Sequence, residues 1–347
     1  MLKYIQSFFV IIIFSMCSNN STKNLTNSEI ISPKIVTDTV LNNSDDPAIW
    51  INKKDYSKSL IIGTDKGKDG LDGALFVFDL DGKEIINKTI RGLKRPNNVD
   101  IAYKLKFDSS YIDIAVCTER NTNSIRVFSL PELEPIDNGG IQVFLGDSLR
   151  FPMGVGLYTK ENGKIYAIVS RKSGPLENYI WQYELADNGK RAVTGNLVRK
   201  FGKFSGKKEI EAIAVDNELG YVYYSDEGVG IRKYFADPDS SNLELALFTD
   251  DQFLSDIEGI SIYKESNKNG FILVSDQQAN KFHIFTREGT EQNPHDHRLV
   301  KIINLSTIES DGSDVTNIPL PGFPKGLFVA MSNPKVFHYY CLEDFFR

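Results

Sequence analysis

A short apolar segment that ends in a hydroxyl residue and an acid recurs six times along this chain of 347 residues. The copies occupy residues 60–65, 112–119, 165–170, 221–226, 271–276 and, in degenerate form, 327–332. Each copy leads into a second apolar segment, which begins at residue 75, 125, 180, 231, 282 or 336. A repeat of about 50 residues made of strands and turns is typical of propeller blades, which bury their sheet faces only by packing side by side. The sequence therefore predicts an all-β fold, a six-bladed β-propeller.

The charge balance limits the class of partner. The formal net charge is −6, with 46 acidic residues against 40 lysines and arginines. A protein that binds nucleic acid through the phosphate backbone needs a basic face, so we expect no nucleic-acid partner. An acidic protein can still bind a polyanion if metal cations lie between the two.

The N-terminus resembles an export signal. Lys3 supplies a positive charge, residues 8–14 are all apolar, and Cys17 follows. This apolar run is too short to span a bilayer, which takes about 20 residues. We expect a signal over residues 1–17, a flexible tether over 18–35 and the propeller over 36–347. A cysteine in this place predicts a lipoprotein, periplasmic or on the cell surface and joined to the membrane only by a lipid on Cys17. Plain cleavage and secretion is the alternative.

A further strand precedes each repeat and contributes one channel-facing position to each blade. Aligning these strands on their apolar alternation gives the column Asp46, Asn98, Met153, Glu211, Glu258 and Asp311. The innermost strand of every propeller blade lines the central channel, so we expect these side chains to form a ring at one mouth. Four of the six are acids.

A second column lies one residue beyond the hydroxyl and acid pairs. Its members are Lys66, Arg120, Lys172, Glu227, Gln277 and Ser332. Blades one to three contribute cations here, and blade four contributes an acid. The predicted mouth is therefore polarised, with carboxylates over blades four to six and basic side chains over blades one to three.

This arrangement suggests chemistry on a phosphate ester. Like charges about 4 Å apart cost about 4 kcal/mol at an effective dielectric constant of 20, so clustered carboxylates need protons or hard cations. Calcium suits them because it takes 6 to 8 oxygen ligands in loose geometry. Arg120, Lys66 and Lys172 could then hold phosphate oxygens. The alternative is a purely structural calcium beside lysines that only keep the surface soluble.

Six motifs resemble those of the β-propeller phytases, the calcium-dependent 3-phytase family that releases phosphate from myo-inositol hexakisphosphate (phytate). They lie, in the family order, at residues 45–50, 97–100, 216–220, 256–259, 309–312 and 323–330. The resemblance implies several calcium ions, held by Asp46, Asp100, Glu211, Glu227, Asp256, Glu258 and Asp311. It also implies that a metal-bridging water attacks phosphorus beside the catalytic acids Glu211, Glu227, Asp256 and Glu258. Lys66, Arg120 and Lys172 would bind the substrate phosphates of calcium-phytate.

Three positions depart from the family pattern. Met153 stands where better-known members carry a tyrosine, Ala212 replaces a glycine, and the stretch Cys117–Glu119 before Arg120 stands where a small, neutral stretch is usual. None of these changes removes an acid or a base from the core set.

Two other functions fit parts of the sequence. Six-bladed propellers include calcium-dependent lactonases, which need metal-binding acids but no basic arc, so Lys66, Arg120 and Lys172 argue against this function. A calcium-stabilised exported propeller could also act as a binding module without turnover. In each case we expect a monomer.

Overall fold

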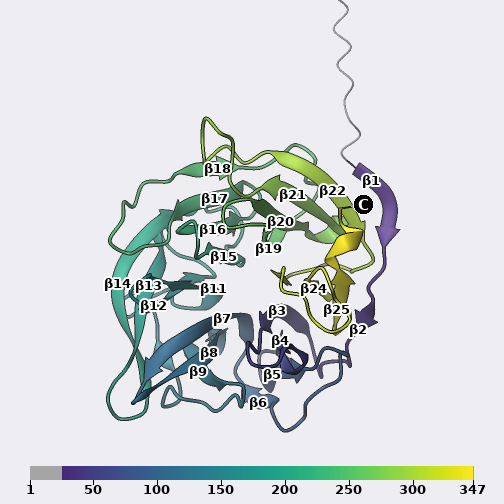
Figure 1. Ribbon diagram of the computed structural model, residues 1–347. Coiled ribbons are helices and arrows are strands. Elements are labelled where there is room, and N and C mark those ends of the chain that lie inside the picture. Colours follow the sequence, from purple (N-terminus) through teal and green to yellow (C-terminus); the bar gives the residue numbers. More distant parts are fainter. Residues whose placement is uncertain (1–25, 347) are drawn as a thin grey trace, which may run out of the picture.

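Six β-sheets surround a central channel in the computed structural model, which describes residues 26–346 (Figure 1). Each sheet is one blade, and the colours of Figure 1 show that the blades follow one another around the ring in sequence order. The predicted all-β, six-bladed β-propeller is confirmed. The predicted signal at residues 1–17 lies outside the described residues. Part of the predicted tether, Thr26–Ile31, forms strand β1.

The first three blades each consist of four strands, and in each blade the strands follow one another outward from the channel in sequence order. Blade one contains β3 (Ser44–Trp50), β4 (Leu60–Asp65), β5 (Gly73–Phe78) and β6 (Ile90–Leu93). Blade two contains β7 (Pro96–Phe107), β8 (Ser110–Glu119), β9 (Ser124–Leu130) and β10 (Ile141–Gln142). Blade three contains β11 (Pro152–Thr159), β12 (Ile165–Arg171), β13 (Glu177–Asp187) and β14 (Val193–Lys203).

The last three blades close the ring. Blade four contains β15 (Ile213–Asp216), β16 (Tyr221–Asp226), β17 (Gly230–Phe235) and β18 (Ala246–Phe248). Blade five contains β19 (Ile257–Lys264), β20 (Gly270–Asp276), β21 (Lys281–Thr286) and β22 (Leu299–Leu305), with β1 parallel to β22. Blade six contains β23 (Ser313–Thr316), β24 (Leu327–Ser332) and β25 (Val336–Cys341), and its outer strand is β2 (Ile35–Val36) from the N-terminal side. A blade built from both ends of the described chain fastens the propeller.

The apolar core is divided among the six blade interfaces. Each of six buried clusters takes its side chains from two neighbouring blades. Between blades six and one, for example, Val329 and Phe337 pack with Ile61 and Phe78. A blade therefore hides its faces only against its neighbours, which explains why the repeat comes in a closed set.

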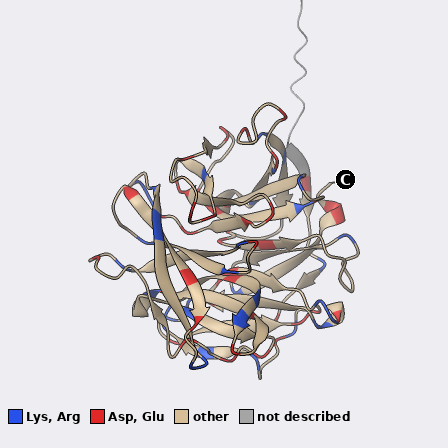
Figure 2. Cartoon of the chain, turned by 60° about the vertical axis from the view of Figure 1, so that its left-hand side comes forward, with Lys and Arg blue, Asp and Glu red and all other residues tan. Residues whose placement is uncertain are grey.

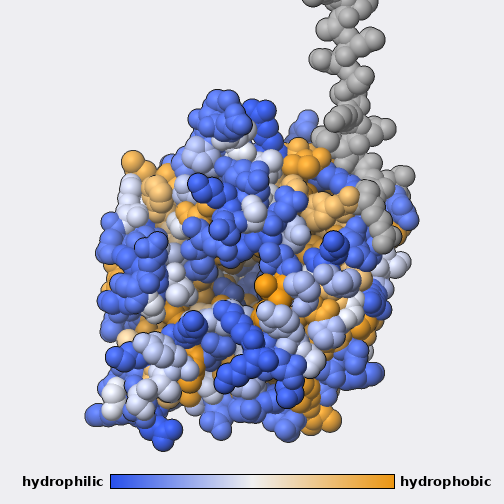
Figure 3. All heavy atoms as spheres, viewed as in Figure 1, coloured by the Kyte–Doolittle hydropathy of each residue, from blue (hydrophilic) through white to orange (hydrophobic). Residues whose placement is uncertain are grey.

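Short connections complete the fold. The helical segments within residues 26–346 are four 3₁₀ turns, η1 (Tyr56–Lys58), η2 (Arg120–Thr122), η3 (Gln277–Ala279) and η4 (Leu342–Asp344). No helix in this part of the chain has the length and apolar character needed to cross a membrane. Charges of both signs are interspersed over the outer strands and loops (Figure 2). The face seen in Figure 3 is mainly hydrophilic and is hollowed at its centre.

Candidate active site

The recurring hydroxyl residue joins neighbouring blades beside the channel. Thr118 of blade two donates to the main-chain oxygen of Met153 in blade three at 2.6 Å, and Ser170 of blade three donates to Ile210 O at 2.6 Å. Ser275 of blade five donates to Ser310 O at 2.8 Å. Each hydroxyl is buried, so its hydrogen bond satisfies a polar group that water cannot reach.

In four of the blades, a β-bulge beside the hydroxyl turns one side chain of the inner strand toward the mouth. In blade one, Ser44 pairs with Asp65 and Pro47 with Gly63, so Asp45 and Asp46 together face the single residue Thr64. The same two-against-one spacing recurs in blades two, three and five. In these four blades the first of the two bulged residues faces the mouth, and blades four and six contribute the residue at the same register. Together they form the ring Asp45, Asn97, Met153, Glu211, Glu258 and Asp311.

The predicted column is therefore right in four blades and one residue late in two. Asp46 and Asn98 were placed in the ring, but the structure gives those positions to Asp45 and Asn97. The ring contacts agree with this register, because the Asn97 side-chain amide donates to Asp45 at 3.2 Å and to Glu211 at 3.3 Å. Ser332 is also displaced, since it pairs as the last residue of β24, which leaves Asn333 in the second column.

The acids at the ends of the second strands hold the loops that enter the site. Asp65, Asp226 and Asp276 are fully buried. Asp65 accepts the main-chain N–H groups of Asn42 and Asn43, both at 2.8 Å, from the loop before the blade-one bulge. Asp226 and Asp276 bind the corresponding loops of blades four and five through Ser205 and Ser255. These acids position the site and do not line it.

Three glutamates converge at the mouth. One carboxylate oxygen from each of Glu211, Glu227 and Glu258 lies within 4.8 Å of the other two. Buried oxygens of Glu227 and Glu258 have no hydrogen-bond partner among the described residues. Burial, followed by the charge of Glu211, raises the pKa of Glu227 to about 8, and the same causes raise the pKa of Glu258. The three carboxylates together could hold a hard cation.

Lys66 lies among the ring acids. Its ammonium nitrogen is 2.8 Å from Asp45 Oδ1 and 3.1 Å from Asp311 Oδ2. Burial raises the pKa of Asp311 to about 8, although the charge of Lys66 opposes that shift. Gln277 donates to the other oxygen of Asp311. Lys66 thus serves as a counterion of the ring in this structure.

The other two predicted bases differ from each other. Arg120, in η2, is 7% exposed, its guanidinium contacts the sulfur of Met153, and its Nε has no hydrogen-bond partner among the described residues. Burial lowers the pKa of Arg120, while the nearby Glu211 opposes the shift. Lys172 is more exposed and forms an ion pair with Glu209. Arg120 is therefore the base of the arc whose donors are most available to an anion.

Comparison with known proteins places this geometry in a family. The family model described as Phytase matches residues 3–340. A 3-phytase of Bacillus subtilis (strain 168) is 32% identical over 306 residues, which cover 84% of this chain and 75% of that protein. The chain belongs to the phytase family. The resemblance drawn from its six motifs is confirmed, and among phytases it has the propeller fold.

Two predicted ligands of this phytase-family chain lie deeper, in a channel cavity of about 190 Å³. Asp46 accepts the N–H of Val99 in blade two at 3.0 Å, and Asp100 accepts that of Leu157 in blade three at 2.7 Å. Asp314 of blade six, which sequence reasoning did not select, accepts from Ile49 in blade one at 2.8 Å. Burial raises the pKa of Asp100 to about 7 and of Asp314 to about 6. These acids fasten neighbouring blades as well as lining the cavity.

The remaining predicted ligand, Asp256, lies on the loop before β19 and forms an ion pair with Lys208. Lys208 and Glu209 are adjacent, and they pair on opposite sides, with Asp256 and Lys172. Neither had been selected from the sequence. Asp45 and Asn97 also escaped selection as site residues, although both belong to matched motifs, and the bulge spacing is the signal that would have found them.

Proposed function

We propose that this chain is a calcium-dependent phosphomonoester hydrolase, a 3-phytase that releases phosphate from phytate. The observation that supports it best is the triad Glu211, Glu227 and Glu258, whose oxygens lie within 4.8 Å of one another beside Arg120, a buried arginine with no carboxylate partner among the described residues. Family membership and the 3-phytase of Bacillus subtilis support the same reaction and substrate.

The donor set fits calcium better than other metals. The ring offers carboxylate and amide oxygens, and the site contains no cysteine or histidine among its described members. Hard oxygen donors in a flexible arrangement are typical of calcium, whereas zinc favours nitrogen and sulfur ligands. The unpaired oxygens of Glu227 and Glu258 are the clearest evidence of fit, because a buried carboxylate oxygen left without a partner is costly. Glu211, Glu227, Glu258, Asp256 and Asp311 would hold calcium at the mouth, and Asp46 and Asp100 in the channel.

Each group has a distinct task in the proposed reaction. Calcium, when bound, would neutralise phosphate charge and lower the pKa of a water that attacks phosphorus. Arg120 would bind two phosphate oxygens through its planar guanidinium. Asn97, which already donates to Asp45 and Glu211, would keep those two acids in position. When cations bind Asp45 and Asp311 in place of Lys66, the ammonium group of Lys66 would be free to contact phosphate.

We also propose that the chain is exported, on the evidence of Lys3, the apolar run and Cys17. Lipidation of Cys17 would anchor the propeller to a membrane surface. Mass spectrometry of the mature N-terminus tests this directly, since a lipoprotein begins at a lipid-modified Cys17 and a secreted form carries no lipid.

A substrate comparison tests the reaction. The purified protein is supplied with calcium and either phytate or a simple lactone, and released phosphate and opened lactone are measured. We expect phosphate from phytate and no lactone hydrolysis. Lactone opening without phosphate release would favour the lactonase alternative. Absence of both, with calcium raising the melting temperature, would favour a calcium-stabilised binding module.

A further inference from the structure

One basic position recurs in the third strand of several blades. It lies near the buried acid that ends the second strand of the same blade. It lies two residues beyond the strand partner of that acid and is filled by Arg126 in blade two, Arg232 in blade four and His283 in blade five. In blade four, Arg232 Nε is 2.8 Å from Asp226. Blade five thus carries a titratable histidine where two other blades carry a permanent cation.

His283 contacts two carboxylates. Its Nδ1 is 2.8 Å from Asp250 and its Nε2 is 3.5 Å from Asp276. The side chains of His283 and Asp276 are fully buried, and that of Asp250 is 11% exposed. Across the strands, His283 faces the apolar Val274 of β20 and Ile302 of β22. The two aspartates are therefore the charged groups that its neighbours present to it.

These contacts lead to the site through the loop at residues 250–256. Asp276 accepts the main-chain N–H groups of Leu254 at 3.0 Å and Ser255 at 2.9 Å, and the next residue is Asp256. Asp250 begins the same loop, and the ring of Phe253 stacks on the imidazole with centroids 3.8 Å apart. His283 thus contacts the loop directly at Asp250 and Phe253, and it contacts Asp276, which binds the main chain of Leu254 and Ser255.

We propose that His283 is a positioning residue whose protonated imidazole holds the 250–256 loop, so that deprotonation loosens Asp256 and weakens cation binding at the mouth. This inference rests on the proposed function. Removing the proton leaves Asp250 and Asp276 buried together with a neutral partner, and two like charges in a buried place destabilise the segment that carries them.

Blade six provides an internal comparison. His338 occupies the same register as His283, but the acid opposite is replaced by Ser332. Burial lowers the pKa of His338 to about 4. At His283 burial acts in the same direction, but the hydrogen bond to Asp250 and the nearby carboxylate of Asp276 outweigh it, so the pKa of His283 is raised above its usual value. The paired acids account for the opposite behaviour of two similarly placed histidines.

The first test needs no variant. NMR titration of the histidine ring protons in the calcium-free protein should give His283 a pKa above 6.5 and His338 a pKa well below it. Amide exchange, corrected for the intrinsic effect of pH, should report faster opening at Leu254 and Ser255 as pH rises through the His283 titration. The proposal would be overturned if His283 is neutral at pH 6. It would also be overturned if the corrected exchange rates at Leu254 and Ser255 do not change as His283 titrates.

The second test measures calcium affinity by calorimetry from pH 6 to pH 9 in the wild type, His283→Gln and the matched control His338→Gln. Outer contacts of a metal site typically change affinity by about 10-fold or more. We expect His283→Gln to bind calcium about 10-fold more weakly at pH 6, with the deficit shrinking toward pH 9, and His338→Gln to follow the wild type. A deficit that is the same at every pH would show a purely structural role and contradict the proposal.

The two proposals can fail separately. Calcium binding that follows this pattern in a protein that releases no phosphate would sink the hydrolase function and leave the loop device intact. Phosphate release that needs calcium, with His283 neutral throughout, would do the reverse. If the protein binds no calcium, the histidine titration and the exchange at Leu254 and Ser255 still decide whether His283 holds the loop.

Discussion

The acidic and basic sides of the mouth differ in how well their charges are paired. On the acidic side, buried oxygens of Glu227 and Glu258 have no partner among residues 26–346. On the basic side, Lys66 and Lys172 already contact carboxylates, whereas Arg120 contacts the sulfur of Met153 through its Nη2 and forms no ion pair with a carboxylate of residues 26–346. The proposed cation would complete the contacts of these acids, and Arg120 is the base with donors most available to an anion. Blade one also contributes an acid to the ring, as the sequence predicted, but that acid is Asp45 and not Asp46.

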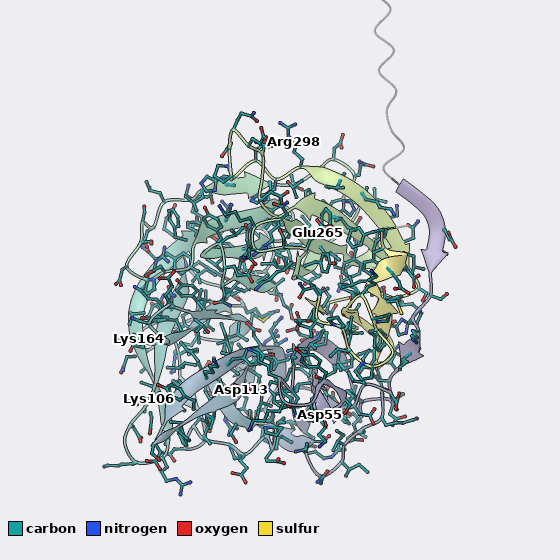
Figure 4. The ribbon with its side chains drawn as sticks, viewed as in Figure 1. Asp55, Lys106, Asp113, Lys164, Glu265 and Arg298 are labelled. Carbon is teal, nitrogen blue, oxygen red and sulfur yellow. The ribbon has the colours of Figure 1, made fainter. Side chains whose placement is uncertain are left out.

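The largest loss should come from the acidic side. Glu211→Gln or Glu227→Gln removes a charge that the cation needs, and we expect phosphate release from calcium-phytate to fall by about 100-fold or more. Glu265→Gln is the control. Glu265 is exposed, follows β19 at the opposite end of the blade from Glu258, and is labelled in Figure 4. Equal activity in Glu211→Gln and Glu265→Gln would remove the triad from the reaction.

On the basic side, Arg120 should matter most. Arg120→Ala should raise KM for phytate by about 10-fold or more, because charge-assisted hydrogen bonds to a phosphate are lost. Arg120→Lys keeps the charge but not the paired donors, so it should recover only part of the loss. Steady-state kinetics at saturating calcium measure both. Full recovery by lysine would show that charge alone is used.

Lys172→Ala should have a smaller effect, a rise in KM of a few-fold with little change in kcat. The side chain of Lys172 is 44% exposed and is shared with Glu209, so solvent already weakens its attraction for phosphate. Glu209→Gln provides a useful partner variant, since it should free Lys172 and lower KM. An unchanged KM in Lys172→Ala would exclude this residue from the substrate contacts.

The smallest expected effect is a pH-dependent shift in stability. Glu227 and Asp311 have pKa values of about 8 in the folded chain, raised by burial from 4.5 and 3.8. The metal-free folded state therefore keeps protons that the unfolded chain has released, so its stability should fall as pH rises from about 5 to about 8. Saturating calcium should flatten this slope. Thermal unfolding measures this slope. A metal-free melting temperature that rises from pH 5 to pH 8 would contradict the raised pKa values of Glu227 and Asp311.

The fold could be predicted from the repeats, because each blade has the same pattern of strands and turns in its sequence. The sequence located the triad as well, since Glu211, Glu227 and Glu258 have clear places in the repeat. It failed where identical residues adjoin: the Asp45–Asp46 and Asn97–Asn98 doublets conceal a slip of one position, and only the bulge decides which member faces the mouth. Pairings across blades, such as Lys208 with Asp256, depend on the closed ring and have no local pattern.

Phosphate release from phytate is proposed to require calcium bound by the acids at the mouth. This requirement is tested most directly by stripping the purified protein with chelator, removing the chelator, and measuring phosphate released from phytate as calcium is added back. The account predicts no release from the stripped protein, recovery that saturates with calcium, and little recovery in Glu227→Gln. Full release by the stripped protein before any calcium is added back would contradict it.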